Sequence, residues 1–411
     1  MSKLQPLRGT RDLLHDECRK LRHVERTVAR VAHLYGFEDI ETPIIEPAAL
    51  FKRSLGETSD VVSKQMYLFK DLGGDEIVLR PEGTAGVARA FISEGLMQHL
   101  PLKLLYSGPM FRYERPQKGR YRQFFQMGVE LLGVETPQAD VEVLAMGNHV
   151  LQELGLGPKT KLLINTIGDA ESRAAYRDRL VAYLETRKSE LSEDSLNRLT
   201  RNPLRILDSK DEGDRRVVST APEFSSSLND VSRKFFDGVL AGLESLGIPY
   251  EIDPKLVRGL DYYCHTVFEF TTDALGSQNA VLSGGRYDNL ISDLGGPKTA
   301  GVGWALGTDR LSLMLETAPE APRPVAIVPL GEDAEREAIK LLQELRAAGI
   351  PADMGYGGNM GKRMKRADKL GCRAAVIMGS DELVKGIVQV KDLKTGEQKE
   401  MKRSDLIGSL S

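Results

Sequence analysis

Two apolar runs joined by a long charged loop restrict the possible folds of this chain more than any other feature. They lie at the two ends of LKLLYSGPMFRYERPQKGRYRQFFQMGVELLG, residues 102–133, and the loop between them holds Pro116 and Gly119. Two strands joined directly by a loop pair antiparallel. Residues 111–122 contain five Arg or Lys and one acid, a net charge of +4 in a chain whose overall charge is −3. The pattern predicts a hairpin with a basic tip.

The basic tip has a composition suited to a polyanion. Its arginines alternate with side chains that stack or form hydrogen bonds, among them Tyr113 and Tyr121. A guanidinium pairs with phosphate through a planar fork of N–H groups, and aromatic rings stack on nucleic-acid bases. A basic surface loop is also often only solvated. The hairpin taken alone leaves both interpretations open.

The character of the sequence changes twice along the chain, which indicates separate parts. With 411 residues the chain exceeds one ordinary domain. Residues 168–250 are strongly helical and polar, which predicts a helical insertion, and APEAPRP at 318–324 has the composition of a linker. Residues 325–411 alternate apolar strands with amphipathic helices. We therefore expect a first domain over 1–320 and a small parallel or mixed α/β domain after the linker.

Composition disfavours several classes of protein. The three cysteines and six histidines are scattered without CxxC, HxH or HxxxH spacing, so we expect neither a disulfide framework nor a protein metal cage. The first residues are polar, and no apolar stretch approaches the roughly 18 residues that cross a bilayer. We expect a cytoplasmic protein without membrane contact. The pI near 6.2 disfavours wrapping by nucleic acid but not a local basic site.

Four further segments are candidates for a binding site. RPEGT at 80–84 places Glu82 on a turn between a strand and a helix, where it could bind a ligand or belong to a helix cap with Thr84 as N-cap. RGLDYY at 258–263 combines a cationic fork with two phenols, which suits a small zwitterion. SGGRYD at 283–288 and GVGWALGTDR at 301–310 supply glycines that permit close ligand approach. The sequence has no P-loop and no GxGxxG strand–helix motif.

The order of these segments resembles that of class II aminoacyl-tRNA synthetases. FRYE in the hairpin is similar to their second motif, GVGWALGTDR to their third, and Pro43 stands where their first motif carries an interface proline. LRPEGTAGVARA and LVRGLDYYCHTVFEF resemble the signature segments of the histidyl-tRNA synthetase family, and the similarity extends over essentially the whole chain. It implies an α+β core with an antiparallel sheet flanked by helices, a C-terminal anticodon-binding domain, and a homodimer.

The resemblance also implies a reaction and a set of residues. The family joins histidine to ATP as histidyl-adenylate, then transfers the histidyl group to the 3′ end of tRNA(His), and Mg²⁺ arrives with ATP. Arg112 and Arg258 are the residues implied for catalysis. The residues implied for histidine are Glu82, Gly83, Thr84, Gln126, Glu130, Arg258, Tyr262 and Tyr263, and those for ATP are Arg112, Glu114 and Arg310. Those expected to contact tRNA are Arg115, Gln117, Lys118, Gly119, Arg120, Arg122, Lys362, Arg363, Lys365, Arg366 and Lys369.

The roles implied for histidine agree with the chemistry of its side chain. Imidazole has one N–H and one lone-pair nitrogen, which the Glu130 carboxylate and the Tyr263 hydroxyl would satisfy. Two positions depart from the commoner family pattern, since Tyr113 and Phe125 stand where histidines are usual. These departures leave the reading of the first tRNA base pair open.

Three alternatives compete with this interpretation. A non-catalytic paralogue of the family is the regulatory subunit of ATP phosphoribosyltransferase; it lacks the anticodon-binding domain and parts of the ATP and tRNA motifs, which this chain retains. Another class II synthetase, for proline, threonine or glycine, would not combine RGLDYY with Glu130. An RNA-binding protein without catalysis would retain RNA and form no adenylate.

Overall fold

The chain forms two compact units with separate cores. In this computed structural model, residues 4–56, 59–209, 211–257, 262–276 and 279–410 are described. One unit spans Met1–Pro319 and the other Glu320–Ser411, and residues 318–324 between them have no regular secondary structure. Within the described residues, no helix combines the length and the apolar character that crossing a membrane requires.

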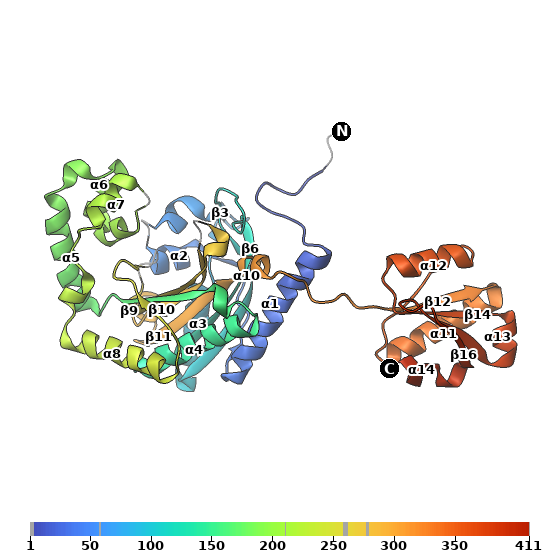
Figure 1. Cartoon of the computed structure of the whole chain (residues 1–411). Coiled ribbons are helices and arrows are strands. Elements are labelled where there is room, and N and C mark those ends of the chain that lie inside the picture. The colour runs from blue at the N-terminus through green and yellow to red at the C-terminus, as the bar shows by residue number, and fades with distance from the viewer. Residues whose placement is uncertain (1–3, 57–58, 210, 258–261, 277–278, 411) are drawn as a thin grey trace. The chain divides into compact units, whose positions relative to one another are not determined.

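An eight-stranded sheet forms the centre of the first unit (Figure 1), in the order β1-β5-β6-β11-β10-β9-β7-β8. Its strands are β1 (Glu38–Asp39), β5 (Leu102–Phe111), β6 (Gln123–Leu132), β7 (Lys161–Thr166), β8 (Glu251–Ile252), β9 (Cys264–Thr271), β10 (Ala280–Arg286) and β11 (Gly301–Gly307). The six inner strands pair antiparallel, and the short edge strands β1 and β8 pair parallel with their neighbours. The predicted α+β core, an antiparallel sheet flanked by helices, is confirmed by this topology.

The hairpin expected from the sequence is the β5–β6 pair. Leu102 pairs with Leu132 and Phe111 with Gln123, so the two strands match along their whole length. Side chains alternate between the two faces of a strand. Accordingly Met127, Val129 and Leu131 belong to the main core. Gln126 and Glu130 point to the opposite face, where they line a pocket.

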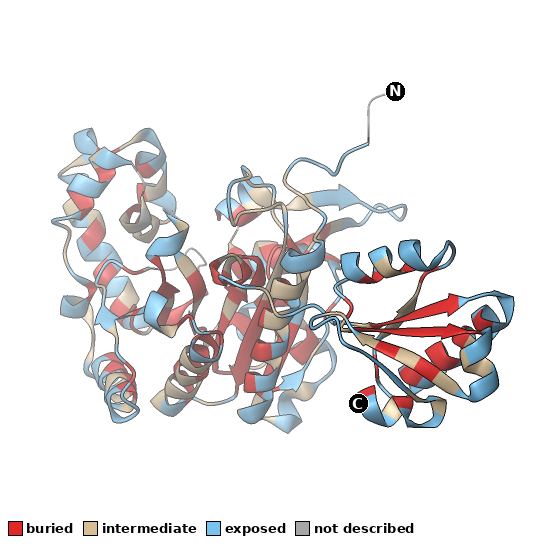
Figure 2. Ribbon diagram, turned by 45° about the vertical axis from the view of Figure 1, so that its right-hand side comes forward, coloured by how far each residue is buried: buried red, intermediate tan, exposed pale blue. Residues whose placement is uncertain are grey.

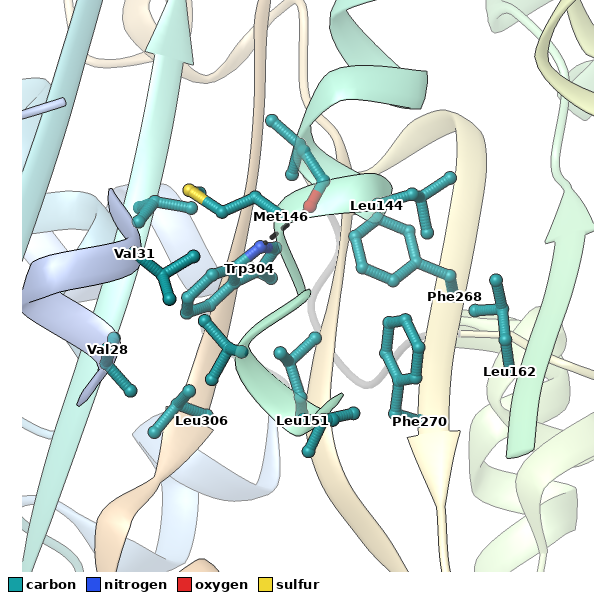
Figure 3. Packing of buried hydrophobic residues seen from close by; sticks show 14 of the residues in the cluster. Val28, Val31, Leu144, Met146, Leu151, Leu162, Phe268, Phe270, Trp304 and Leu306 are labelled. Carbon is teal, nitrogen blue, oxygen red and sulfur yellow. Dashed lines mark hydrogen bonds between the residues drawn. The ribbon is translucent and has the colours of Figure 1, made fainter. Parts of the chain in front are cut away.

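Three helices cover the core face of the sheet, namely α1 (His15–Leu34), α4 (Pro137–Glu153) and α8 (Asp230–Ser245). Apolar residues recur with helical spacing along one face of α1, where Leu21, Val24, Val28 and Val31 are all buried. Figure 3 shows how Val28 and Val31 lie near Trp304 of β11, with Phe268 and Phe270 of β9 further along. The Trp304 indole N–H donates to the carbonyl of Val143, which satisfies its only polar atom.

The opposite side of the sheet carries a small second layer. It contains a three-stranded sheet in the order β2-β4-β3. The elements are β2 (Ile45–Pro47), α2 (Ala48–Leu55), β3 (Tyr67–Lys70), β4 (Glu76–Leu79) and α3 (Thr84–Ser93). The chain leaves β4, turns through residues 80–83 and enters α3, as the sequence predicts. The RPEGT turn therefore lies above the β5–β6 hairpin.

The region expected as a helical insertion lies between β7 and β8. It contains α5 (Ala170–Glu185), α6 (Glu193–Arg201), α7 (Glu212–Val218) and α8. The first three form a separate group (Figure 1) with buried Tyr176, Leu180 and Leu199. α8 instead packs on α4 and contributes Val239 and Leu243 to the main core. The part that stands apart from the core thus ends before α8.

The second unit is a small mixed α/β fold. Its sheet has the order β13-β12-β14-β15-β16, with the first three strands parallel and the last two antiparallel. The elements are β12 (Val325–Leu330), α11 (Glu332–Ala347), β13 (Ala352–Met354), α12 (Met360–Lys369), β14 (Ala374–Gly379), α13 (Ser380–Lys385), β15 (Ile387–Asp392), β16 (Gln398–Lys402) and α14 (Leu406–Leu410). Strands β12 and β14 at the centre of this sheet are almost entirely buried, whereas the edge strand β16 is mostly exposed. Figure 2 shows the exposed outer faces of the helices in this unit.

Candidate active site

A pocket of about 870 Å³ opens on the face of the large sheet opposite α1 and α4. It is lined by β6, β10 and β11, by the RPEGT turn, by the base of the hairpin and by residues of the insertion. Nine of the residues implied for histidine and ATP line it, and they come from four separate segments of the chain. The described members that line it are Glu82, Thr84, Arg112, Glu114, Gln126, Glu130, Tyr262, Tyr263 and Arg310.

Glu130 is the most deeply buried acid of the pocket, with 1% of its surface exposed. It pairs across the sheet with Gly303 of β11, and a Cβ at Gly303 would collide with the carboxylate. Tyr287 donates its hydroxyl to one carboxylate oxygen, Oε2. The other oxygen, Oε1, is buried and has no hydrogen-bond partner among the described residues. Burial raises the pKa of Glu130 to about 8.

The RPEGT turn holds Glu82 in a fixed orientation. Its Oε2 accepts a hydrogen bond from the Thr84 amide (2.8 Å) and its Oε1 from the Ala85 amide (2.9 Å). Glu82 therefore caps α3 with its own carboxylate, whereas Thr84, considered as the N-cap from sequence, is the first helical residue. Gly83 is needed between them because a side chain there would collide with the Tyr106 ring. Burial raises the pKa of Glu82, and the two amides oppose that shift.

Sequence inspection missed Tyr106, which lies between these two acids. It belongs to β5, is 2% exposed, and its hydroxyl is buried without a partner among the described residues. Its ring occupies the space that side chains at Gly83 and Gly128 would fill. Gln126 on β6 likewise has a buried carbonyl oxygen without a partner in the described part of the chain. The alternation of side chains along the paired strands could have identified Tyr106. It pairs with Gly128 and therefore lies on the same face of the sheet as Gln126 and Glu130.

The two tyrosines of RGLDYY reach the pocket just before β9 begins. Tyr262 and Tyr263 are each 6% exposed, and their ring centroids are 4.6 Å apart. The Tyr262 ring meets the Tyr287 ring edge-on at 5.7 Å. The three phenols of Tyr262, Tyr263 and Tyr287 thus line the pocket together with Glu130. Arg258, expected at the reacting carboxylate, lies outside the described residues.

The other end of the pocket is strongly basic. Arg112 donates through Nε to the carbonyl of Pro81 (2.9 Å) and lies over the Phe124 ring. Arg310 donates to the carbonyls of Gly119 (3.2 Å) and Ala280 (2.6 Å). Burial lowers the pKa of Arg112, and burial together with the nearby charges of Arg120 and Arg112 lowers the pKa of Arg310. Guanidinium groups that repel one another in this way are stabilised by a bound polyanion.

The basic tip of the hairpin divides into two sets of residues. Arg115, Gln117 and Lys118 are exposed. The remaining charged residues are engaged within the hairpin: Arg120 pairs with Glu114 at 2.5 Å, and Arg122 lies over the Tyr113 ring at 3.9 Å. Gly119 has a positive φ of 72°, which the tight turn at the tip requires. Tyr113, at the position where histidine is more usual, is therefore a stacking partner of Arg122.

The basic residues of α12, in the second unit, differ in how far they are exposed. Lys362, Lys365 and Lys369 are exposed, and Arg366 is exposed enough to pair with Asp353 at 3.1 Å. Arg363 is only 5% exposed. It donates to the carbonyls of Gly355 and Gly358 and forms an ion pair with Glu335, so it holds the preceding loop in place. Tyr356 in that loop is exposed, and Arg366 of α12 lies over its ring. Tyr356 was not identified from the sequence.

The insertion contributes to the pocket, which the sequence did not predict. Ser192, Arg198, Arg205 and Asp211 from α6, α7 and their connections line it. No group of three or more His, Cys, Asp or Glu side chains that could hold a metal ion occurs in the described part of the chain. Glu114 and Glu269 line the pocket, and their charges act on nearby Arg310.

Comparison with known proteins agrees with this geometry. A family model described as histidyl-tRNA synthetase matches residues 9–311, and one described as anticodon binding domain matches 324–411. The chain is 59% identical to the histidine–tRNA ligase of Rhodospirillum rubrum over 97% of its length and 96% of that protein's. It is 53% identical to the histidine–tRNA ligase of Gluconacetobacter diazotrophicus, covering 98% and 97% of the two chains.

Solved structures show the same relationship. The crystal structure of apo histidyl-tRNA synthetase from S. aureus superposes with a TM-score of 0.84 at 38% identity, covering 99% of this chain and all of the other. Both units of the chain, including the insertion, are therefore present in relatives of established family. The chain belongs to the histidyl-tRNA synthetase family.

Proposed function

We propose that the pocket on β6, β10 and β11 is where this chain, a histidine–tRNA ligase, activates histidine with ATP before transfer to tRNA. The observation that carries the proposal is Glu130, with one oxygen held by Tyr287 and the other buried and without a partner among the described residues. An unsatisfied buried acceptor is unfavourable and favours a ligand that donates a hydrogen bond. An imidazole N–H fits this position, because it can donate to Oε1 while the rings of Tyr262, Tyr263 and Tyr287 line the same pocket.

The remaining groups at this end fit the two other polar parts of histidine. Tyr263 would meet the second imidazole nitrogen, and Glu82, Thr84 and Gln126 would bind the α-amino group. The Gln126 carbonyl oxygen is an acceptor without a described partner, as an ammonium ligand requires. Amino acids that lack the matching donor and acceptor would leave these buried groups unpaired, which can reject competitors by a factor of about 10⁴.

The basic end of the pocket fits the triphosphate of ATP. Arg112 would bind the α-phosphate and Arg310 the γ-phosphate, while Glu114 adjoins the nucleotide. Arg258 is proposed to act where the histidine carboxylate attacks the α-phosphorus; it lies outside the described residues. The attack forms a carboxylate–phosphorus bond and releases diphosphate, so the protein needs to align and neutralise rather than supply a nucleophile.

Mg²⁺ fits this end of the pocket as a companion of ATP. Two carboxylates, Glu114 and Glu269, are too few for a protein cage but suit an ion that keeps its waters and phosphate ligands. When bound, the ion would neutralise phosphate charge.

Two surfaces are proposed for tRNA. At the hairpin, exposed Arg115, Gln117 and Lys118 would meet the acceptor end, and Gly119, Arg120 and Arg122 would shape that surface. On α12, Lys362, Lys365, Arg366 and Lys369 would contact the anticodon end. Arg363 would act through the loop that it holds, because its donors are used inside the unit.

A homodimer is proposed through the small sheet of the first unit. Ile45, Leu68 and Phe69 are 51%, 47% and 42% exposed on β2 and β3, and Ile44 beside Pro43 is 42% exposed. Apolar residues grouped on a short sheet are typical of an interface. The cytoplasm is proposed as the compartment, because the three cysteines are all free.

The test is amino-acid-dependent exchange of diphosphate into ATP, measured separately with each of the twenty amino acids. Exchange with histidine alone is expected, and Arg112→Ala should lower its rate by about 10³ because a phosphate contact made in the transition state is lost. The Tm of Arg112→Ala should stay near that of the wild type. A folded wild-type chain without exchange would favour the regulatory-subunit alternative, and exchange with another amino acid would identify a different synthetase.

A further inference from the structure

Strand β9 begins with an irregular segment that aims the two pocket tyrosines. In its pairing with β10, Val267 stands opposite Gly285 and Cys264 opposite Arg286, so His265 and Thr266 bulge out of the ladder. His265 has a φ of 47°, a left-handed conformation that non-glycine residues adopt only under constraint. Bulges next to binding sites redirect neighbouring side chains. Tyr262 and Tyr263 directly precede this bulge.

The root of the insertion holds this bulge from the other side. The Ile167 amide donates to the His265 carbonyl (2.8 Å), and the His265 amide donates to the Gly168 carbonyl (2.7 Å). Arg173, in the first turn of α5, donates through Nη1 to the Tyr263 carbonyl at 2.6 Å. The segment that carries the predicted imidazole-reading residue is thus bonded directly to the insertion.

The insertion touches the same pocket at its far end. Ser192, Arg198 and Asp211 line the pocket there. Its root is in turn fixed to α8, because the Asn229 side chain donates to Asp169 (2.8 Å) and the Asp169 amide donates to Ser232 (3.0 Å). The root of the insertion is therefore bonded on both sides. A displacement of α5 would move the bulge at His265 with it.

We propose that Arg173 is a positioning residue that couples the insertion to the histidine end of the pocket, by fixing the backbone of Tyr263. This inference rests on the proposed function of the pocket. Because coupling between two sites is reciprocal, histidine bound at Tyr263 would order the root of the insertion as much as the insertion orders Tyr263. A charged donor to a carbonyl is among the stronger hydrogen bonds, so its loss would release the segment.

The first test compares Arg173→Met with Arg173→Lys in the full chain. Arg173→Met is expected to raise the KM for histidine in diphosphate exchange by about tenfold, the range expected for loss of a charge-assisted hydrogen bond. The KM for ATP should stay within about twofold, since the arginines of the phosphate end are unaffected. Arg173→Lys keeps a cationic donor and should recover part of the loss.

The matched control is Arg179→Met in the same helix. Arg179 bonds Ser226 and Ser227 inside the insertion and does not reach β9, so its loss should leave the KM for histidine unchanged. An unchanged KM for histidine in Arg173→Met, or an equal rise in the KM values for histidine and ATP, would overturn the proposal. Wild-type exchange with histidine is measured beside it, and its absence would instead count against the function proposed for the pocket.

The second test follows hydrogen exchange at the amides of Ile167 and His265. Histidine is expected to slow their exchange in the wild type and in Arg179→Met, and to do so much less in Arg173→Met. This readout does not depend on catalysis. Equal protection by histidine in wild type and Arg173→Met would show that the bulge is ordered without Arg173 and would contradict the coupling.

Discussion

In the absence of ligand, two interactions shift the pKa of Glu130 in opposite directions. Its burial raises its pKa to about 8, whereas the Tyr287 hydrogen bond favours the charged form and only partly offsets burial. An acid with a raised folded-state pKa stabilises the fold below its unfolded pKa, and this contribution is lost as pH rises through the folded pKa. The ligand-free protein should therefore lose stability through Glu130 between about pH 4.5 and 8.

The variant Glu130→Gln tests this environment. Because glutamine does not ionise, the ligand-free variant should melt above wild type at pH 8, and the difference in Tm should shrink towards pH 5. Its KM for histidine in exchange should rise by at least about tenfold, since the imidazole N–H loses a charged acceptor. Melting curves between pH 5 and 8.5 give the first result. A pH-independent difference in Tm would mean that Glu130 does not titrate in this range.

At the scale of single elements, the basic hairpin depends on a segment far away in the sequence. The Arg122 amide donates to the Gly9 carbonyl, and Arg11 lies over the Tyr121 ring while pairing with Asp309. Asp309 also accepts from the Phe125 amide at the start of β6. The hairpin base is thus fixed from both sides, and only its outermost residues remain available to a partner.

The exposed part of the tip gives the next prediction. Arg115→Ala combined with Lys118→Ala should reduce charging of tRNA and lower the slope of log affinity against log salt by about 2, one for each lost phosphate contact. Diphosphate exchange should remain near wild type, because neither side chain lines the pocket. Arg30→Ala, an exposed position on α1, is the control and should change neither quantity. A parallel fall in exchange would place the tip in adenylate chemistry instead.

Sequence patterns predicted the elements whose residues repeat locally. The β5–β6 hairpin and the strand–turn–helix around Glu82 follow from two strand-like runs around a loop and from a Pro–Glu–Gly turn. Residue patterns also marked RPEGT and RGLDYY as candidate binding segments, but the role of each pocket residue was implied only by the family resemblance. The bulge at His265, the burial of Arg363 and the approach of α6 to the pocket were not foreseen, because each depends on contacts between distant segments.

For the molecule as a whole, the proposed homodimer gives a separate prediction. Phe69→Asp and Leu68→Asp should each place a charge in the interface and shift the chain towards monomer, because an unpaired buried charge is strongly unfavourable. Sedimentation at micromolar protein measures the assembly, with Val384→Asp, on exposed α13, as control. The proposed interface would be refuted if both variants sedimented like the wild type while circular dichroism showed the fold intact.

The two units are held by distinct cores. The clusters around Trp304 and around Phe91 draw only on the first unit, and those around Val376 and Ile377 only on the second. Neither core requires the other for its completion. The regions that match the histidyl-tRNA synthetase model and the anticodon binding domain model therefore have separate hydrophobic cores.

Side chains alternate between the two faces of β11, so substitutions on the core face and on the pocket face have different consequences. Val302, Trp304 and Leu306 face the core, whereas Gly303 faces Glu130 on the pocket side. On the core side, apolar residues can replace one another while the packed volume is kept. On the pocket side, a Cβ at position 303 would collide with the Glu130 carboxylate and with the backbone carbonyl of Val129. Descendants of this chain are therefore free to vary one side of the strand and restricted to glycine on the other.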